Sequence, residues 1–368
     1  MPSSKQRDYL FDNYKAFLIV LVVIGHFIEK SYDNNLFLTT LKWLIVSFHM
    51  PAFIFISGYF SKRRLPFRVL ISKLVIPYLI FEILYYFLYV VIIHKPTGLY
   101  LMYPKFSLWY LQALFFWRVL TPYVKKIPHY MIFTIAAGLL IGCSGISGNL
   151  LSIPRTLVFF PFFLAGTDFN REKLTLLRTR RNRILAVILI AAFTVFLILN
   201  PYCRTVSPKV FYGRYNYHFL GQTVTEGILC RCVCYLIGFA MTLAVALLMS
   251  GRKTCYSYIG TRTMAVYLFH GLVYSTIKGS SGILSDIHSL AESLLLILFC
   301  VALVILLSIP QLSTVTAAVS NIQLPAFLLQ LHLPHPEFSK PKLPDIPALF
   351  AVPCQDPFYS LRFWWVFY

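Results

Sequence analysis

The chain has 368 residues, of which 58% are hydrophobic and only 12% are charged, and its mean hydropathy is +0.71. Soluble domains are usually about 45–50% apolar and about 25% charged, so this composition excludes an ordinary soluble protein. The net charge of +20 does not by itself indicate nucleic-acid binding. Basic membrane proteins concentrate their Lys and Arg residues in cytoplasmic loops.

Ten apolar segments follow one another along the chain, and some are shorter than the ~20 residues that a spanning helix needs. They are residues 14–28, 41–60, 74–93, 107–123, 129–145, 154–169, 184–199, 226–249, 264–278 and 290–309. With the N-terminus inside, the inner loops carry roughly twice as many Lys and Arg residues as the outer loops, which is the bias that sets membrane orientation. We therefore predict an all-α polytopic membrane protein with about ten transmembrane helices and both termini inside.

The predicted transmembrane domain covers residues 1–310. Residues 311–368 are rich in proline and poor in charge, which predicts an irregular or disordered tail. The first apolar segment lacks a small-residue cleavage site, so we expect it to be retained as a helix. The eight cysteines are scattered and indicate neither a disulfide framework nor a metal site.

The first segment places ionisable groups on a helix that is otherwise suited to lipid. Lys15 and His26 are eleven residues apart, so on a helix they lie within about 20° of one face and about 16.5 Å apart along the axis. Asp12 lies one turn before Lys15 and is expected to pair with it. The alternative is that Asp12 and Lys15 mark the membrane edge while His26 bonds a neighbour. Because intramembrane ionisable residues usually mark a site, we interpret His26 as its centre.

The second segment contains His49, Pro51 and the pair Ser57-Gly58 within an aromatic run. His49 fits an interhelical hydrogen bond and a role in the site equally well, whereas Ser57-Gly58 favours close helix contact over chemistry. A basic loop follows, made up of Lys62, Arg63, Arg64, Arg68 and Lys73. Its cations match phosphate oxygens, but the positive-inside signal and attraction to anionic lipid explain them more simply.

Several later helices each carry a lone charge that needs a partner or a wet cavity. Glu82 and Arg118 are such residues and are candidates to pair with each other. Arg155 begins a helix on the predicted outer side, where it can meet a substrate, and Arg231 is another intramembrane cation. Trp109 is interpreted as an interfacial anchor, the usual role of aromatic residues at the membrane edge.

The predicted outer loop from Asn200 to Thr225 is rich in aromatic residues, with Arg204, Lys209 and Arg214 among them. Aromatic faces with polar neighbours suit sugar rings, and an interfacial belt has a similar composition, so both interpretations stand. His270 is a further polar residue near the middle of the ninth segment.

Five dispersed motifs, in this order, resemble the acyltransferase family 3 membrane enzymes, most closely the subgroup labelled fucose 4-O-acetylase-like. They are Asp12-x-x-Lys15 with Gly25-His26; Phe48-His-Met-Pro through Ser57-Gly-Tyr-Phe60 with its basic loop; Leu108-Trp-Tyr-Leu111; Arg155-Thr-Leu-Val-Phe-Phe-Pro-Phe-Phe163; and Tyr258-Ile-Gly260 through His270-Gly271. The resemblance runs from about Arg7 to Pro310. It implies ten transmembrane helices, an acyl-coenzyme A donor on the cytoplasmic side and transfer of the acyl group to a hydroxyl of a cell-surface glycan or its lipid-linked precursor.

In many members of that family an arginine stands eleven positions before the histidine of the first helix, and here Lys15 takes that place. Lysine keeps the charge but not the bidentate fork. On this resemblance His26, Lys15 and Asp12 are the candidate catalytic residues. The basic loop, Lys62, Arg63, Arg64 and Arg68, is the candidate site for the phosphates of acetyl-CoA. The candidate residues that line the site are His49, Ser57, Glu82, Trp109, Arg118, Arg155, Arg231 and His270.

His26 is expected to act either as the general base that deprotonates the acceptor alcohol or as a carrier that is itself acylated. The expected partners are a glycan or lipid-linked sugar acceptor and the lipids of the plasma membrane, and nucleic acid is not among them. A transporter or flippase that exports a polysaccharide or lipid-linked sugar without covalent chemistry is the alternative, because a cavity with cations and outer aromatics fits that function too.

Overall fold

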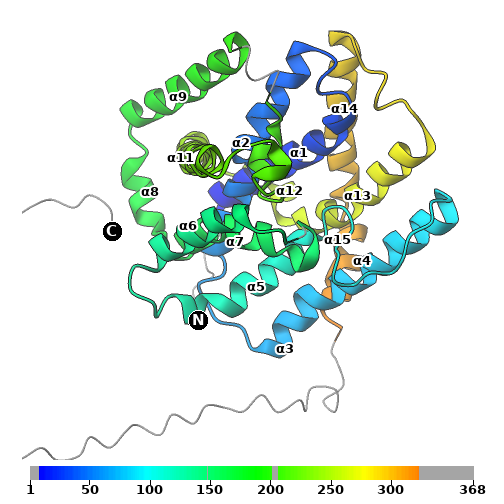
Figure 1. Cartoon of the computed structure of the whole chain (residues 1–368), viewed down its shortest axis with the longest axis horizontal. Coiled ribbons are helices and arrows are strands. Elements are labelled where there is room, and N and C mark those ends of the chain that lie inside the picture. The colour runs from blue at the N-terminus through cyan, green and yellow to red at the C-terminus, as the bar shows by residue number, and fades with distance from the viewer. Residues whose placement is uncertain (1–7, 147, 201–205, 323–368) are drawn as a thin grey trace, which may run out of the picture. The chain divides into compact units, whose positions relative to one another are not determined.

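The computed structural model describes residues 8–146, 148–200 and 206–322, which form a bundle of helices that contains no strand within these ranges (Figure 1). The longer helices are α1 (Tyr9–Phe27), α2 (Leu36–Tyr59), α4 (Ile76–Phe87), α5 (Trp109–Val124), α6 (Tyr130–Leu140), α7 (Ile153–Asp168), α9 (Arg180–Leu199), α11 (Val224–Leu248), α13 (Thr263–Ser280), α14 (Leu290–Leu307) and α15 (Pro310–Ser320). Short helices are α3 (Phe67–Leu70), α8 (Arg171–Leu177) and α12 (Ser257–Thr261). The predicted all-α class is confirmed.

Single turns extend or join these helices. They are η1 (Ile28–Lys30), η2 (Ile71–Val75), η3 (Leu88–Ile92), η4 (Ile141–Cys143), η5 (Leu150–Ser152), η6 (Pro208–Tyr212) and η7 (His218–Leu220). The π-helical turn η2 joins α3 to α4 and the π-helical turn η3 extends α4, which gives one continuous span, Phe67–Ile92.

Every one of the ten predicted apolar segments coincides with a helix, but several helices begin earlier than predicted. α2 begins at Leu36 because the Asn35 side chain caps it, accepting a hydrogen bond from the Leu38 backbone N–H at 2.9 Å. α9 begins at Arg180, where the Thr179 hydroxyl is the cap. A capping side chain determines the residue at which a helix begins, and a hydropathy pattern carries no information about caps.

Seven helices of the described residues are long and apolar enough to cross a membrane, fewer than the ten spans predicted. They are Tyr9–Lys30, Leu36–Tyr59, Phe67–Ile92, Leu150–Asp168, Arg180–Leu199, Val224–Leu248 and Leu290–Leu307. The three others are short, as α5 and α6 are, or carry polar residues such as His270 and Lys278, as α13 does. The chain is therefore a multi-pass membrane protein, and its orientation stays a prediction.

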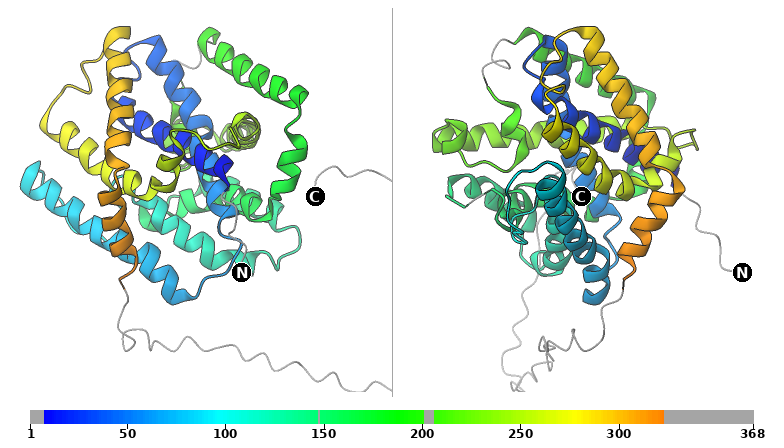
Figure 2. Two further views of the ribbon diagram at one scale, coloured as in Figure 1. Left: turned by 180° about the vertical axis from the view of Figure 1, so that it is seen from behind. Right: turned by 90° about the vertical axis from the view of Figure 1, so that its right-hand side faces the viewer.

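Helix α1 lies in the middle of the bundle and packs against α2, α12, α13 and α14, whereas α9 lies at the edge (Figures 1 and 2). Polar residues tie α1 in place. The Asn13 amide donates to the carbonyls of Ser250 and Arg252 at 2.8 and 2.9 Å, and the Tyr14 hydroxyl donates to the Thr242 carbonyl at 2.9 Å. Backbone carbonyls of α11 and of the segment that follows it are thereby satisfied without water, as a lipid environment requires.

Helices α2 and α7 approach until their backbones touch. A Cβ added to Gly58 would lie 2.0 Å from the Phe163 carbonyl oxygen, and one added to Gly166 would lie 1.9 Å from the Phe55 carbonyl oxygen. The interpretation of Ser57-Gly58 as a close-contact site is thus confirmed for Gly58.

The prediction that residue 311 begins an irregular tail is wrong for its first ten residues, because α15 runs from Pro310 to Ser320 and packs against α13 and α4. Proline interrupts a helix in its interior but is favoured in the first turn, where its missing N–H has no partner to lose. The rest of the predicted tail, residues 323–368, lies outside the described residues.

Replacing Gly166 by Ala is expected to destabilise the protein by about 1–3 kcal/mol, the usual cost of overpacking, because the new methyl group meets backbone that cannot change rotamer. Thermal unfolding of the purified protein in detergent measures this as a lower Tm. Gly145→Ala is the control, since no heavy atom lies within 4 Å of the added Cβ. An unchanged Tm for Gly166→Ala would contradict the close approach of α2 and α7.

Candidate active site

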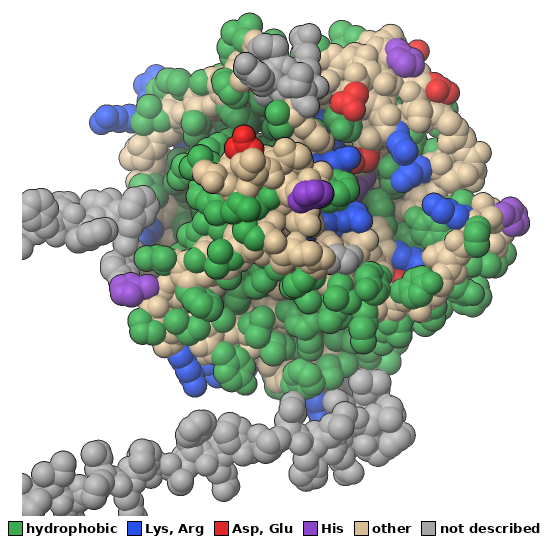
Figure 3. Space-filling view, viewed as in Figure 1, with side chains coloured by type: hydrophobic (Ala, Val, Ile, Leu, Met, Phe, Trp, Pro, Cys, Tyr) green, Lys and Arg blue, Asp and Glu red, His purple; other side chains and the backbone are tan. Residues whose placement is uncertain are grey.

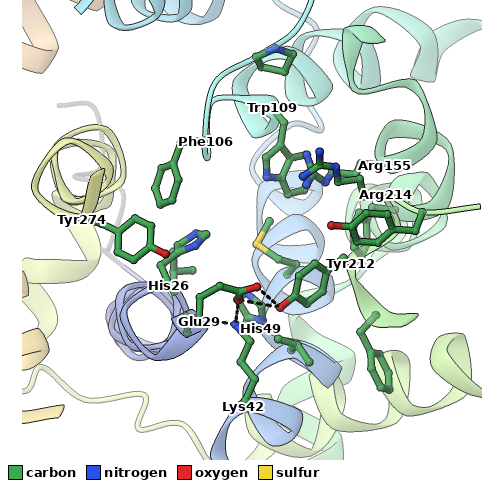
Figure 4. A pocket seen from close by; sticks show the side chains of 18 of the residues that line it. His26, Glu29, Lys42, His49, Phe106, Trp109, Arg155, Tyr212, Arg214 and Tyr274 are labelled. Atoms are coloured by element: carbon green, nitrogen blue, oxygen red, sulfur yellow. Dashed lines mark hydrogen bonds and ion pairs between the residues drawn. The ribbon is translucent and has the colours of Figure 1, made fainter. Parts of the chain in front are cut away.

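A cavity of about 280 Å³ opens beside the end of α1 that carries His26 (Figure 4). Its walls come from α1, α2, the segment before α5, the starts of α5 and α7, the η6 segment and α13. The side chains labelled in Figure 4 are His26, Glu29, Lys42, His49, Phe106, Trp109, Arg155, Tyr212, Arg214 and Tyr274. Residues that are distant in the sequence thus meet in one polar cavity inside a hydrophobic bundle.

His26 is half-buried in the wall of this cavity and is held by aromatic contacts. Its ring centroid lies 4.5 Å from that of Phe106, 5.4 Å from that of His270 and 6.2 Å from that of Tyr274. Neither ring nitrogen forms a hydrogen bond with another described residue. The imidazole is therefore positioned by packing and keeps its nitrogens available to a ligand.

His270 is fully buried directly behind His26. Its Nδ1 lies 2.9 Å from the Val266 carbonyl oxygen, and because a carbonyl only accepts, Nδ1 carries the hydrogen. The Nε2 atom is left as a buried acceptor without a partner among the described residues, and so is the Tyr85 hydroxyl. A Cβ on Gly271 would lie 2.0 Å from the Tyr85 hydroxyl, so Gly271 makes room for this buried polar group.

Glu29, Lys42 and Tyr212 form the polar floor of the cavity. The Lys42 ammonium donates to the Gly25 carbonyl at 2.6 Å and forms an ion pair with Glu29, while the Tyr212 hydroxyl donates to Oε2 of Glu29 at 2.9 Å. Burial first, and the Glu29 carboxylate second, raise the pKa of the Tyr212 phenol. It therefore stays protonated and continues to donate.

Sequence reasoning did not assign Glu29 or Lys42 to the site. The available signal was spacing, since Glu29 follows His26 by three residues and so lies near it on a helical surface. Lys42 lies within α2, which begins at Leu36, and is buried.

The predicted residue Arg155 lies in the cavity wall, with its guanidinium carbon 4.8 Å from the centroid of the Trp109 ring. Trp109 is buried beneath it and does not serve as an exposed interfacial anchor. From the loop after η6, Arg214 lies in the same wall and is 5.3 Å from the Tyr215 ring. Arg204 lies outside the described residues.

His49 also lines the cavity, and its Nδ1 bonds the Ile45 carbonyl of its own helix at 2.7 Å. The hydrogen bond of the His49 Nδ1 atom therefore stays within α2 and does not join two helices.

A smaller cavity of about 30 Å³ is also lined by His26 and shares Val22, Met50 and Trp109 with the larger one. Ile19, Phe53 and Tyr110 are among its other walls. The Tyr110 hydroxyl is hydrogen-bonded to Ser57, which therefore lies just beyond the smaller cavity and not in the main one. His26 is thus in contact with two cavities.

The charged residues near the start of α1 gather at the opposite end of that helix. Lys15 pairs with Asp12 at 3.1 Å, as predicted, and lies 5.1 Å from the Phe60 ring. Close by, Lys62 donates to the Phe169 carbonyl and lies 4.6 Å from the Tyr59 ring, and burial lowers the pKa of its ammonium. The three arginines of the basic loop, Arg63, Arg64 and Arg68, are exposed.

Two predicted site residues have structural partners instead, and a third lies away from the main cavity. Glu82 is fully buried and pairs with Lys105 at 2.7 Å, so its predicted pairing with Arg118 is wrong; Lys105 reaches it from the loop that leads to Phe106. Arg118 is half-buried on α5 and does not line the main cavity. Arg231 donates to the carbonyls of Gly138 and Tyr215, each at 3.0 Å. Glu82 and Arg231 therefore support two segments of the cavity wall without reaching the cavity.

No group of three or more His, Cys, Asp or Glu side chains in the described ranges is arranged to hold a metal ion.

Comparison with known proteins gives one relative and one family. Nodulation protein NolL of Sinorhizobium fredii is 43% identical over 61 residues, so the match covers 16% of this chain and only 17% of that protein. No solved structure matches the chain. The family described as an acyltransferase domain matches residues 8–310, which include every described residue of the cavity walls. The chain therefore belongs to this acyltransferase family.

Proposed function

We propose that the enzyme moves an acetyl group from acetyl-CoA to a hydroxyl of a cell-surface or lipid-linked glycan at the plasma membrane. The observation that carries the proposal is the position of His26, which lines both the large cavity and the small one. Acyl transfer needs one group that reaches both a donor and an acceptor, and a histidine that lines two adjoining cavities meets that need. A transporter needs no such group, and the family assignment favours the enzyme.

In the proposed reaction, a hydroxyl of the acceptor attacks the thioester carbonyl and a nitrogen of His26 takes the hydroxyl proton. The C–S bond breaks as the new C–O ester bond forms, and the proton passes to the thiolate of coenzyme A. Imidazole, with an unperturbed pKa of about 6.5, suits this task, and general-base help is typically worth 10²–10⁴-fold. Alternatively, His26 first accepts the acetyl group and then passes it to the hydroxyl.

The donor is proposed to bind at the end of the bundle that carries Lys15 and Lys62. The exposed arginines 63, 64 and 68 have no ion-pair partner among the described residues, and guanidinium groups bind phosphate oxygens in pairs of hydrogen bonds. The pantetheine arm would then extend past Tyr110 and the small cavity to His26, a rise of about 16.5 Å along α1 from Lys15.

The acceptor is proposed to enter the large cavity. Phe211, Tyr212 and Tyr215 from the η6 segment line it, and aromatic faces beside polar groups suit a sugar ring. This favours the sugar-binding interpretation of these loop residues over an interfacial belt. Tyr217, in contrast, is buried and donates to the Leu139 carbonyl at 2.7 Å, so it supports the loop.

Replacing His26 by Ala is expected to abolish transfer of label from [¹⁴C]acetyl-CoA to glycan, because the proton acceptor is lost. The protein should still insert and fold, since His26 forms no hydrogen bond with another described residue. His288→Ala, an exposed histidine, is the matched control. Labelled glycan produced by purified His26→Ala at the parent rate would contradict the mechanism.

Changing arginines 63, 64 and 68 together to Gln is expected to raise the KM for acetyl-CoA about tenfold or more, since charge-assisted hydrogen bonds contribute about 1.5–3 kcal/mol each. The kcat should change less, because these residues are distant from His26. The matched control changes three exposed arginines of α9, residues 180, 181 and 183, to Gln. Equal KM values for the two triple variants would show that the basic loop serves only orientation or lipid binding.

A further inference from the structure

The large cavity carries more positive charge than its own acid neutralises. Lys42, Arg155, Arg214 and Lys278 line it, and Glu29 is its one carboxylate within the described part of the chain. Glu29 is already engaged by Lys42 and by the Tyr212 hydroxyl. The other three cations form no ion pair with any described residue. An unpaired cation in a partly desolvated cavity is costly, and an anionic ligand offsets that cost.

Arg155 and Arg214 line the same cavity from different elements, α7 and the loop after η6 (Figure 4). Each guanidinium lies over an aromatic ring, Arg155 at 4.8 Å from that of Trp109 and Arg214 at 5.3 Å from that of Tyr215. Stacking uses the face of the guanidinium and leaves its N–H groups free along the edges. The N–H groups of two half-buried guanidinium groups are therefore available to an oxyanion.

The rings beneath these arginines are themselves fixed. Trp109 is buried and stacks on Phe159 with centroids 5.9 Å apart. Tyr215 stacks on Phe219 at 4.4 Å with an interplanar angle of 7°, and Arg231 binds its carbonyl at 3.0 Å. The cations are held in place before any ligand arrives, which lowers the entropy lost on binding.

The surface shows the same concentration of charge. Lys and Arg side chains gather around a hollow on one face of the molecule, while hydrophobic side chains cover much of the rest of that face (Figure 3). Lys278 is exposed and lines the cavity as well. This distribution attracts an anion toward the cavity mouth.

We propose, on the basis of the proposed function, that the acceptor is an anionic glycan whose phosphate or carboxylate is bound by Arg155 and Arg214 while a nearby hydroxyl faces His26. The anionic group is either a sugar carboxylate, as in a uronic acid, or a phosphate ester on the sugar or its lipid carrier. Arg155 and Arg214 are specificity-determining residues in this proposal.

The test measures binding without acetyl-CoA, using the full chain in phosphatidylcholine nanodiscs at low ionic strength. The probes are methyl β-D-glucopyranoside, the matching methyl glucuronide and the matching 6-phosphate, and affinity is followed by tryptophan fluorescence and thermal shift. The charged probes should bind about tenfold or more tightly than the neutral one, as charge-assisted hydrogen bonds predict. Whichever charged probe binds more tightly identifies the source of the anion.

The double variant Arg155→Gln with Arg214→Gln should lose the preference for charged probes and keep its affinity for the neutral one, which also verifies that it is folded. Arg155→Lys should keep part of the preference, because it retains charge without the fork. Arg252→Gln, an exposed arginine on another segment, should keep all of it.

Equal affinity of the parent protein for all three probes would overturn the proposal, and so would a charge preference that survives in the double variant. If the double variant lost affinity for desulfo-coenzyme A, a donor analogue without the thiol, while its preference among the glycosides stayed unchanged, these arginines would instead be assigned to the donor. Because no acetyl group is present, failure here leaves the proposed transfer intact, and failure of the His26 experiment leaves this binding result intact.

Discussion

The Lys42 ammonium organises the site, because it binds the Gly25 carbonyl and the Glu29 carboxylate on either side of His26 in the sequence. A buried cation in an apolar bundle has to be fully paired, so α1 and α2 are held together at this one level. The orientation of His26 follows from that constraint, since the α1 turn that carries it is fixed by Lys42. Glu29 extends the same network to Tyr212 and thus to the η6 segment.

The ends of α1 have different chemistry. Asp12 and Lys15 pair with each other near the exposed basic loop, whereas Glu29 pairs with a buried lysine from a second helix. The contacts of Lys15 are one carboxylate and the face of Phe60. A point charge makes both contacts, so the bidentate fork is not needed for them.

Hydropathy predicted the helices well because each long apolar run has only one stable form in lipid. It also identified His26, Arg155, His49 and His270, since a lone polar residue in an apolar run stands out. The helix starts at Leu36, Arg180 and Pro310 were missed because a capping side chain or a first-turn proline decides them locally.

Partners across the bundle were also beyond the sequence. Glu82 pairs with Lys105 rather than Arg118, because the loop between η3 and α5 folds back over α4. Arg231 is as isolated in the sequence as Arg155, yet it binds backbone carbonyls while Arg155 faces the cavity. Tertiary contacts decide whether a lone charged residue supports the fold or faces the cavity, and the sequence pattern does not contain those contacts.

The central claim is that donor and acceptor reach His26 from opposite ends of the bundle. Proteoliposomes in which all molecules share one orientation, verified by proteolysis of an N-terminal tag, test it directly with membrane-impermeant [¹⁴C]acetyl-CoA. Label should reach a glycan confined to the Glu29 side only when the donor is confined to the Lys62 side. Equal transfer with donor and acceptor both on the Glu29 side would contradict the account.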